Sequence, residues 1–166
     1  MRVESLYDAH RTALVRYLAR FSGDSDLAED AAQEAFVRLA ERPPARDENL
    51  RAWLFTVATR IAVDQARTRR RRNELLEAAP EGQALGDPPD RPDEALDRAE
   101  LQRRVRAALD TLDDKERTVL LMREEGFAHR EIATAVGTTT GSVGTMIARA
   151  LRKLAARLPA GTEALP

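Results

Sequence analysis

Apolar side chains in the first half of the chain recur every three or four positions, which is the spacing of one face of an α-helix. A first helix is predicted to close at Gly23. Asp26 with Glu29 resembles a capping box that begins a second helix, which should end before Pro43. Asn49 is expected to cap a third helix. The positions that form these apolar faces are Leu6, Tyr7, Leu14, Tyr17, Leu18, Phe21, Ala28, Ala31, Ala35, Leu39, Leu50, Leu54, Val57 and Ile61.

The second half of the chain repeats the helical spacing. Thr111 with Asp114 is expected to begin a helix that continues to Gly126. No segment shows a convincing alternation of apolar and polar residues of the kind that marks a strand. The pattern therefore predicts an all-α chain. The face that precedes Thr111 is formed by Leu101, Val105, Ala108 and Leu112.

The composition changes between the two helical halves. This stretch is rich in acidic residues, proline and glycine and poor in large apolar residues. It can neither continue a regular helix nor bury enough surface to offset the entropy lost on ordering. We therefore expect two small helical domains joined by a flexible acidic linker, with boundaries at residues 1–73, 74–92 and 93–160.

Residues 131–143 have the spacing of a helix-turn-helix. Ala133 allows two helices to approach closely, Gly137 can supply a left-handed turn, and Val143 places an apolar contact on the inner face of the second helix. Such a unit lays its second helix in the major groove of DNA. DNA binding is favoured over an ordinary helical hairpin with a solvated basic face. The rest of the small core is expected from Ile132, Val136, Ile147 and Leu151.

A net charge of −1 conceals a strong segregation of charge. Residues 60–72 hold six arginines and one aspartate, residues 74–100 hold nine acidic residues and two arginines, and residues 149–157 hold four bases and no acid. The two basic stretches favour contacts with phosphate groups. For residues 69–72 a purely solvated helix end stays an open alternative.

Several classes of protein are excluded by composition. With no cysteine and only two histidines, the chain can form no disulfide or thiolate site, and a histidine-built zinc site is not expected. No apolar run approaches membrane-spanning length and no signal peptide is present, so we expect a cytoplasmic protein without membrane insertion. No catalytic motif, small-molecule substrate or cofactor is indicated. Only residues 159–166 follow the last predicted helix, so we expect no fused regulatory domain and expect control from expression, proteolysis or a separate partner.

Three segments resemble motifs of bacterial sigma-70 family RNA polymerase sigma factors. Residues 27–39 and 52–60 look like consecutive helices of region 2, and residues 109–117 with the stretch after them look like region 4. Together they cover nearly the whole chain in the order that the family has. The size resembles the extracytoplasmic-function (ECF) group, which keeps only these two regions.

The resemblance implies a transcription initiation factor that binds core RNA polymerase, directs it to promoters and helps to open the −10 element. The implied partners are the β′ clamp helices, the β flap, promoter DNA and an anti-sigma factor, and the implied location is the nucleoid, through polymerase. Residues 43–49 correspond to the loop that captures a flipped base. The acidic linker corresponds to a segment in the RNA-exit path, and residues 69–72 would hold phosphates. The implied polymerase contacts are Asp30, Gln33, Glu34, Phe36 and Arg38. The implied −10 contacts are Asn49, Trp53, Arg60, Asp64, Arg67, Arg70 and Arg71, although core packing is the favoured reading of the tryptophan from its apolar neighbours alone. The implied −35 contacts are Arg123, His129, Arg130, Thr140, Ser142, Thr145, Arg149 and Lys153.

The predicted recognition helix departs from the family at two positions. Gly144 and Met146 stand where similar proteins commonly carry arginine, the commonest reader of guanine. We therefore predict weak or unusual −35 recognition, or a helix that meets a protein regulator instead. Two other functions stay open: a free-standing helix-turn-helix regulator, and an adaptor that binds polymerase or an anti-sigma factor without reading promoters.

Overall fold

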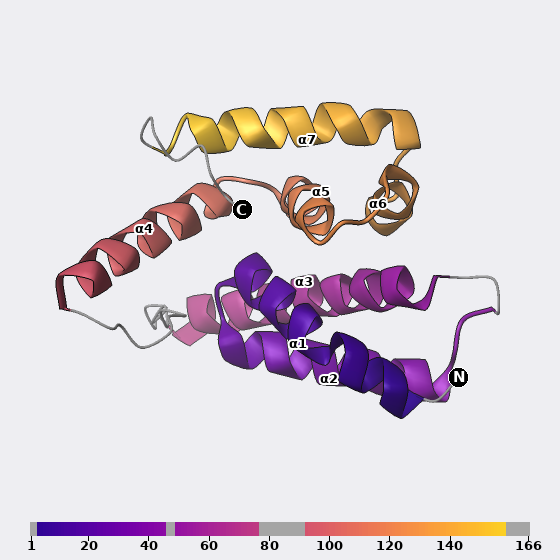
Figure 1. Ribbon diagram of the computed structural model, residues 1–166. Helices are drawn as coiled ribbons and strands as arrows, with labels where there is room; N and C mark the ends of the chain where they lie inside the picture. Colours follow the sequence, from indigo (N-terminus) through magenta and orange to yellow (C-terminus); the bar gives the residue numbers. More distant parts are fainter. Residues whose placement is uncertain (1–2, 46–48, 77–91, 159–166) are drawn as a thin grey trace. The chain divides into compact units, whose positions relative to one another are not determined.

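The computed structural model describes residues 3–45, 49–76 and 92–158. Within these residues the chain contains seven α-helices and no strand, which confirms the all-α prediction (Figure 1). The helices are α1 Val3–Ser22, α2 Ser25–Glu41, α3 Leu50–Leu76, α4 Pro92–Asp110, α5 Asp114–Glu124, α6 His129–Val136 and α7 Thr140–Ala155.

The chain divides into two compact units, residues 1–83 and residues 84–166, and each is described by itself. The division falls inside the predicted linker. α3 continues to Leu76 and so includes the first residues of that predicted linker. Residues 77–91 lie outside the described residues, so the linker boundaries stay a prediction.

In the first unit, α2 packs against both α1 and α3. The core-facing side of α2 is built largely from alanine, which lets the neighbouring helices approach closely. Tyr17 lies at the centre, with its ring 5.1 Å from that of Phe55 and its hydroxyl 2.9 Å from Thr59 Oγ1. The Thr59 hydroxyl also donates to Phe55 O over 2.7 Å, so these hydrogen bonds pair the buried hydroxyl groups inside the core. Tyr7, expected on the apolar face of α1, is instead 40% exposed.

The start of α2 differs from the prediction. Gly23 has a φ of 72°, and the chain then extends at Asp24, whose Oδ1 accepts a hydrogen bond of 3.0 Å from the Leu27 amide. Asp24 is therefore the N-cap, and the predicted capping box of Asp26 and Glu29 is wrong. The left-handed glycine ends α1 so close to the next helix that the first polar residue after it already has the extended backbone of a cap.

The predicted cap of α3 is confirmed, whereas that of α5 is wrong. Asn49 Oδ1 accepts hydrogen bonds from the first amides of α3. α5 is capped by Asp113, which forms a reciprocal capping box with Glu116. Thr111, the predicted cap of α5, donates its hydroxyl to Ala108 O at the end of α4 instead.

In the second unit, α5, α6 and α7 pack against one another, and α4 packs against α7. Gly137 has φ 68° and ψ 47°, which confirms the predicted left-handed turn between α6 and α7. Leu151, expected in the core, is 50% exposed, and Leu101 of α4 is 45% exposed. The inner face of α7 advances in steps of four, three and four residues, so position 151 faces outward. The buried residues on that face are Val143, Ile147, Ala150 and Leu154.

Candidate nucleic-acid and protein interfaces

Polar side chains that the sequence assigns to a protein partner lie on the outer face of α2. Asp30 and Gln33 are exposed, and Glu34 Oε1 accepts a hydrogen bond of 2.8 Å from Arg38 Nε, one turn later on the helix. Both members of this ion pair are about half exposed, so it contributes little to stability and can be exchanged for contacts with a partner.

Phe36 does not lie on this polar face. It is 5% exposed, and its ring centroid is 4.9 Å from that of Tyr7. Phe36 also lines a cleft beside this aromatic pair, through which a partner can approach it.

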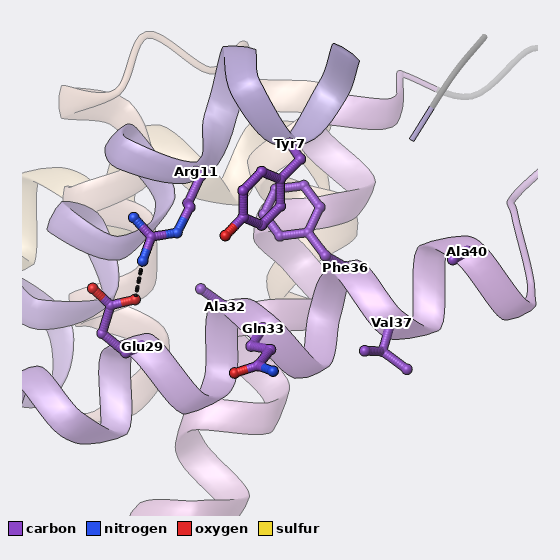
Figure 2. Close-up of a pocket in the computed structure, with 8 residues that line it drawn as sticks. All are labelled: Tyr7, Arg11, Glu29, Ala32, Gln33, Phe36, Val37 and Ala40. Atoms are coloured by element: carbon purple, nitrogen blue, oxygen red, sulfur yellow. Dashed lines mark hydrogen bonds and ion pairs between the residues drawn. The ribbon is translucent and has the colours of Figure 1, made fainter. Parts of the chain in front are cut away.

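That cleft has a volume of about 400 Å³ and opens between α1 and α2 (Figure 2). Arg11 donates to Glu29 over 2.7 Å at one end, while Val37 and Ala40 lie at the other. The eight lining residues are Tyr7, Arg11, Glu29, Ala32, Gln33, Phe36, Val37 and Ala40.

Sequence reasoning missed the apolar part of this surface. Val37 is 44% exposed and lies one helical turn after Gln33. A valine on an otherwise polar face is the signal that could have identified it. The apolar rim next to polar groups suits a protein partner better than a nucleic acid.

The predicted −10 residues follow one stripe along α3. Trp53 is half buried, whereas Arg60, Asp64, Arg67 and Arg71 are exposed. Their positions advance in steps of seven, four, three and four residues, which keeps all five on one side of the helix. Trp53 therefore contributes to packing and also continues the exposed stripe.

Arg69 and Arg70 differ although they are adjacent in the basic run. Arg70 is exposed, whereas the guanidinium of Arg69 is directed at two carboxylates of the first unit. The sequence assigns phosphates to the whole run, but Arg69 has acidic partners inside its own unit. Asn49 acts as a helix cap, and residues 46–48 of the predicted base-capturing loop lie outside the described residues.

The exposed surface at the start of α7 consists of small residues. Thr140 and Thr145 are exposed, whereas Ser142 is half buried and its hydroxyl lies 2.8 Å from that of the N-cap Thr139. A Cβ added at Gly144 would have one neighbour within 4 Å, the Cε1 atom of His129 at 4.0 Å. The missing side chain therefore leaves space on the face that a DNA-binding helix would present.

Three of the predicted −35 residues come together at the end of α5 and the start of α6. Arg123 Nη1 lies 3.5 Å from His129 Nε2, and Arg130 next to it is exposed. This basic group lies beside the first turns of α7, because His129 also approaches Gly144. Arg149, farther along α7, is exposed as well.

Lys153 has a role that the sequence does not indicate. Its ammonium donates to both carboxylate oxygens of Glu116, at 2.7 Å and 2.8 Å. The Glu116 side chain is only 5% exposed, so its charge requires a cation inside the unit. The ammonium of Lys153 is thus engaged by an acid of its own unit while its side chain stays 44% exposed, and its DNA contact stays a prediction.

No group of His, Cys, Asp and Glu side chains suited to a metal ion occurs in the described part of the chain. None of the helices in residues 3–45, 49–76 and 92–158 is both long and apolar enough to cross a membrane.

Each of the two units matches a known protein family region. Residues 6–72 match sigma-70 region 2, and residues 102–154 match sigma-70 region 4. The ECF RNA polymerase sigma factor SigL of Mycobacterium tuberculosis is 33% identical over 156 residues, covering 92% of this chain and 86% of the relative. The probable ECF sigma factor SigI of the same species is 34% identical over 170 residues, covering 97% and 57%.

Solved structures share the fold. The sigma factor RpoE of Bartonella quintana, in complex with the anti-sigma factor NepR, superposes with a TM-score of 0.71 at 23% identity, covering 91% of this chain and 92% of the other. CnrH in complex with the cytosolic domain of CnrY gives a TM-score of 0.66 at 24% identity, covering 93% and 85%.

Proposed function

Because this chain belongs to the ECF group of the sigma-70 family and is a promoter-directing sigma factor, we propose that its first unit binds core RNA polymerase and the −10 element while its second unit binds the −35 element. The observation that carries the proposal is the order of the two matches, region 2 followed by region 4, each on its own unit. Members of the family are not enzymes, and we assign the chain no catalytic residue and no cofactor.

The outer face of α2 is the proposed polymerase-binding surface. Asp30 and Gln33 supply exposed polar groups, Glu34 supplies a half-exposed one, and Val37 supplies an apolar contact next to the cleft. A protein interface of this kind combines an apolar centre with a polar rim. The β′ clamp helices are the proposed partner here, and the β flap is the proposed partner of the second unit.

The stripe along α3 is the proposed −10 surface. Arg60, Arg67 and Arg71 present cations at helical spacing, which suits the regular spacing of phosphates on a strand. Trp53 is partly accessible at the start of the stripe and can stack on an unpaired base. Asp64 can accept hydrogen bonds from base amino groups.

The start of α7 and the basic group beside it form the proposed −35 surface. Thr140 and Thr145 have hydroxyl and methyl groups suited to base edges, while Arg123, Arg130 and Arg149 are placed for phosphates. Without arginine at position 144, specificity from this helix should be low, and more of the promoter selection should fall to the first unit.

An anti-sigma factor is a further proposed partner. The structures of RpoE and CnrH were determined with NepR and CnrY, and this chain shares their two-unit helical fold. An adaptor that does not read promoters is the second candidate function, and Gly144 at the recognition surface is the observation that favours it.

The test is transcription with reconstituted holoenzyme. The full chain is combined with core polymerase and genomic DNA, and transcript starts are mapped against core alone and against the variant D30N/Q33A. Defined starts that need the chain and weaken in the variant are expected. A chain that binds core without producing defined starts would be an adaptor. A chain that shifts DNA alone and ignores core would be a free-standing regulator.

A further inference from the structure

Arg69 differs from the arginines that follow it in sequence. Its side chain is 34% exposed, whereas Arg70, Arg71 and Arg72 are all exposed residues on the last turns of α3. A run of four arginines looks uniform in sequence, but only its first member packs back toward the body of the unit.

The guanidinium of Arg69 connects α3 to the first turns of α2. Its Nη1 lies 2.6 Å from Asp24 Oδ2, and its Nη2 lies 3.5 Å from Asp30 Oδ2. Asp24 uses its other oxygen to cap α2, through the hydrogen bond from the Leu27 amide. One arginine therefore contacts both the residue that begins α2 and a residue on its outward face.

The two contacts differ in strength and in exposure. The bond to Asp24 is short and partly shielded, whereas Asp30 is held at the limit of hydrogen bonding and its side chain is 64% exposed. The short contact anchors the guanidinium, and the long one orients the carboxylate of Asp30 without neutralising it fully. Asp30 can therefore accept a second cation from a partner while Arg69 stays bound to Asp24.

Arginine is the residue type that such an arrangement needs. Its planar fork can reach two acceptors at once, whereas the single ammonium of lysine cannot hold both in the same geometry. Without a cation between them, the negatively charged carboxylates of Asp24 and Asp30 would repel each other.

We propose that Arg69 is a positioning residue for polymerase binding, which acts by orienting Asp30, and that it does not contact promoter phosphates. The inference rests on the proposed function, since Asp30 belongs to the proposed polymerase surface. In this proposal, Arg69 supports the protein interface, whereas Arg70 and Arg71 contact DNA.

The experiment measures two quantities for each variant of the full chain: the affinity for core polymerase, and the salt dependence with which the holoenzyme binds a forked −10 template. The variants are R69Q, R69K, R70Q, D30N and D30N/R69Q. R69Q should weaken core binding about threefold to tenfold, as expected for a partly exposed charged pair. R70Q should lower the slope of log K against log salt by about 0.7–0.9, which corresponds to one phosphate contact, and R69Q should leave that slope unchanged.

A double-mutant cycle tests whether Arg69 acts through Asp30. The effect of R69Q should shrink in the D30N background, because the two substitutions remove the same contact. R69K should keep the Asp24 contact and normal thermal stability but recover core affinity only in part. A purely structural arginine would instead give full recovery in R69K, and that result would overturn the inference.

Other outcomes separate this inference from the proposed function. If D30N weakens core binding but R69Q does not, the proposed positioning role of Arg69 is wrong. The same holds if the effects of the two substitutions on core affinity simply add. In both cases the proposed polymerase-binding surface on α2 is still supported. A drop in the DNA salt slope in R69Q equal to that in R70Q would make Arg69 a phosphate contact. If D30N leaves core binding unchanged, the polymerase surface itself is wrong, and the inference falls with it.

Discussion

Lys153 Nζ lies 2.7 Å and 2.8 Å from the two carboxylate oxygens of Glu116, and this pair joins α7 to the start of α5. Glu116 also accepts from the Asp113 amide, so one buried carboxylate both closes a capping box and holds α7. The pair therefore fixes how α7 lies against the helix that supports it.

Replacing Lys153 by methionine should destabilise the second unit and leave the salt dependence of −35 binding unchanged. The buried Glu116 would lose its cation, at a cost of about 1–3 kcal/mol in unfolding free energy once the 44% exposure of Lys153 is allowed for. Hydrogen exchange of the α5 and α7 amides measures the stability. K115M is the matched control, since Lys115 is an exposed lysine in the same unit. An unchanged exchange rate with a lower salt slope would identify Lys153 as a phosphate contact.

Placing a charge at Val37 should weaken polymerase binding without unfolding the first unit. Val37 is 44% exposed beside the cleft, so V37D has little effect on the core but introduces a charge that must be desolvated at the interface. A loss of about tenfold or more in core affinity is expected, at the scale of an interface hot spot. L75D is the control, because Leu75 is 84% exposed and lies outside the proposed interface. Equal losses in both variants would remove the cleft from the polymerase surface.

Arginine at position 144 should improve −35 binding. The site has room, because an added Cβ would lie 4.0 Å from His129 Cε1, and replacing glycine in a helix interior adds about 0.5–1 kcal/mol of stability. G144R should therefore raise both thermal stability and affinity for −35 DNA, with a salt slope steeper by about 0.9.

G144A separates the two effects of that substitution, because alanine improves helix stability without adding a charge. It should raise stability and leave the salt slope as it is. If G144R behaves like G144A in DNA binding, α7 does not approach DNA at this position, and the adaptor function gains support.

The first unit should lose stability in mild acid because of His10. Burial, and after it the positive charge of Arg51, lowers the pKa of His10 below its ordinary value of 6.5. The folded state therefore favours neutral His10, so its contribution is complete above pH 6.5 and is lost as the pH falls through the lowered pKa. Urea unfolding followed by Trp53 fluorescence should show a smaller loss between pH 7 and pH 5.5 in H10Q than in the unmodified chain. Identical losses would show that His10 does not carry the effect.

Local sequence pattern predicted the elements well where a single rule decides the outcome. The closing turn at Gly23, the cap at Asn49 and the left-handed turn at Gly137 all follow from the backbone preferences of one residue. The choice between neighbouring acidic caps did not follow, because Asp24 and Asp26 have equal propensity and the position of the preceding turn decides between them.

The roles of individual cations were not predictable from the sequence. Arg69 and Asp24 are 45 positions apart, and Lys153 and Glu116 are 37 apart. A count of charges along the chain treats each cation in a basic run as equally available. Only the packing of helices against one another shows which of them are already bound to an acid.

The two contacts of Asp24 restrict which residues can replace it. Serine, threonine and asparagine cap helices about as well as aspartate does. Only aspartate among them brings a second anionic oxygen, and here that oxygen holds Arg69. A change at position 24 that looks conservative for helix capping would therefore remove the short ion pair between α2 and α3, so the residue that starts one helix also favours an arginine near the end of another.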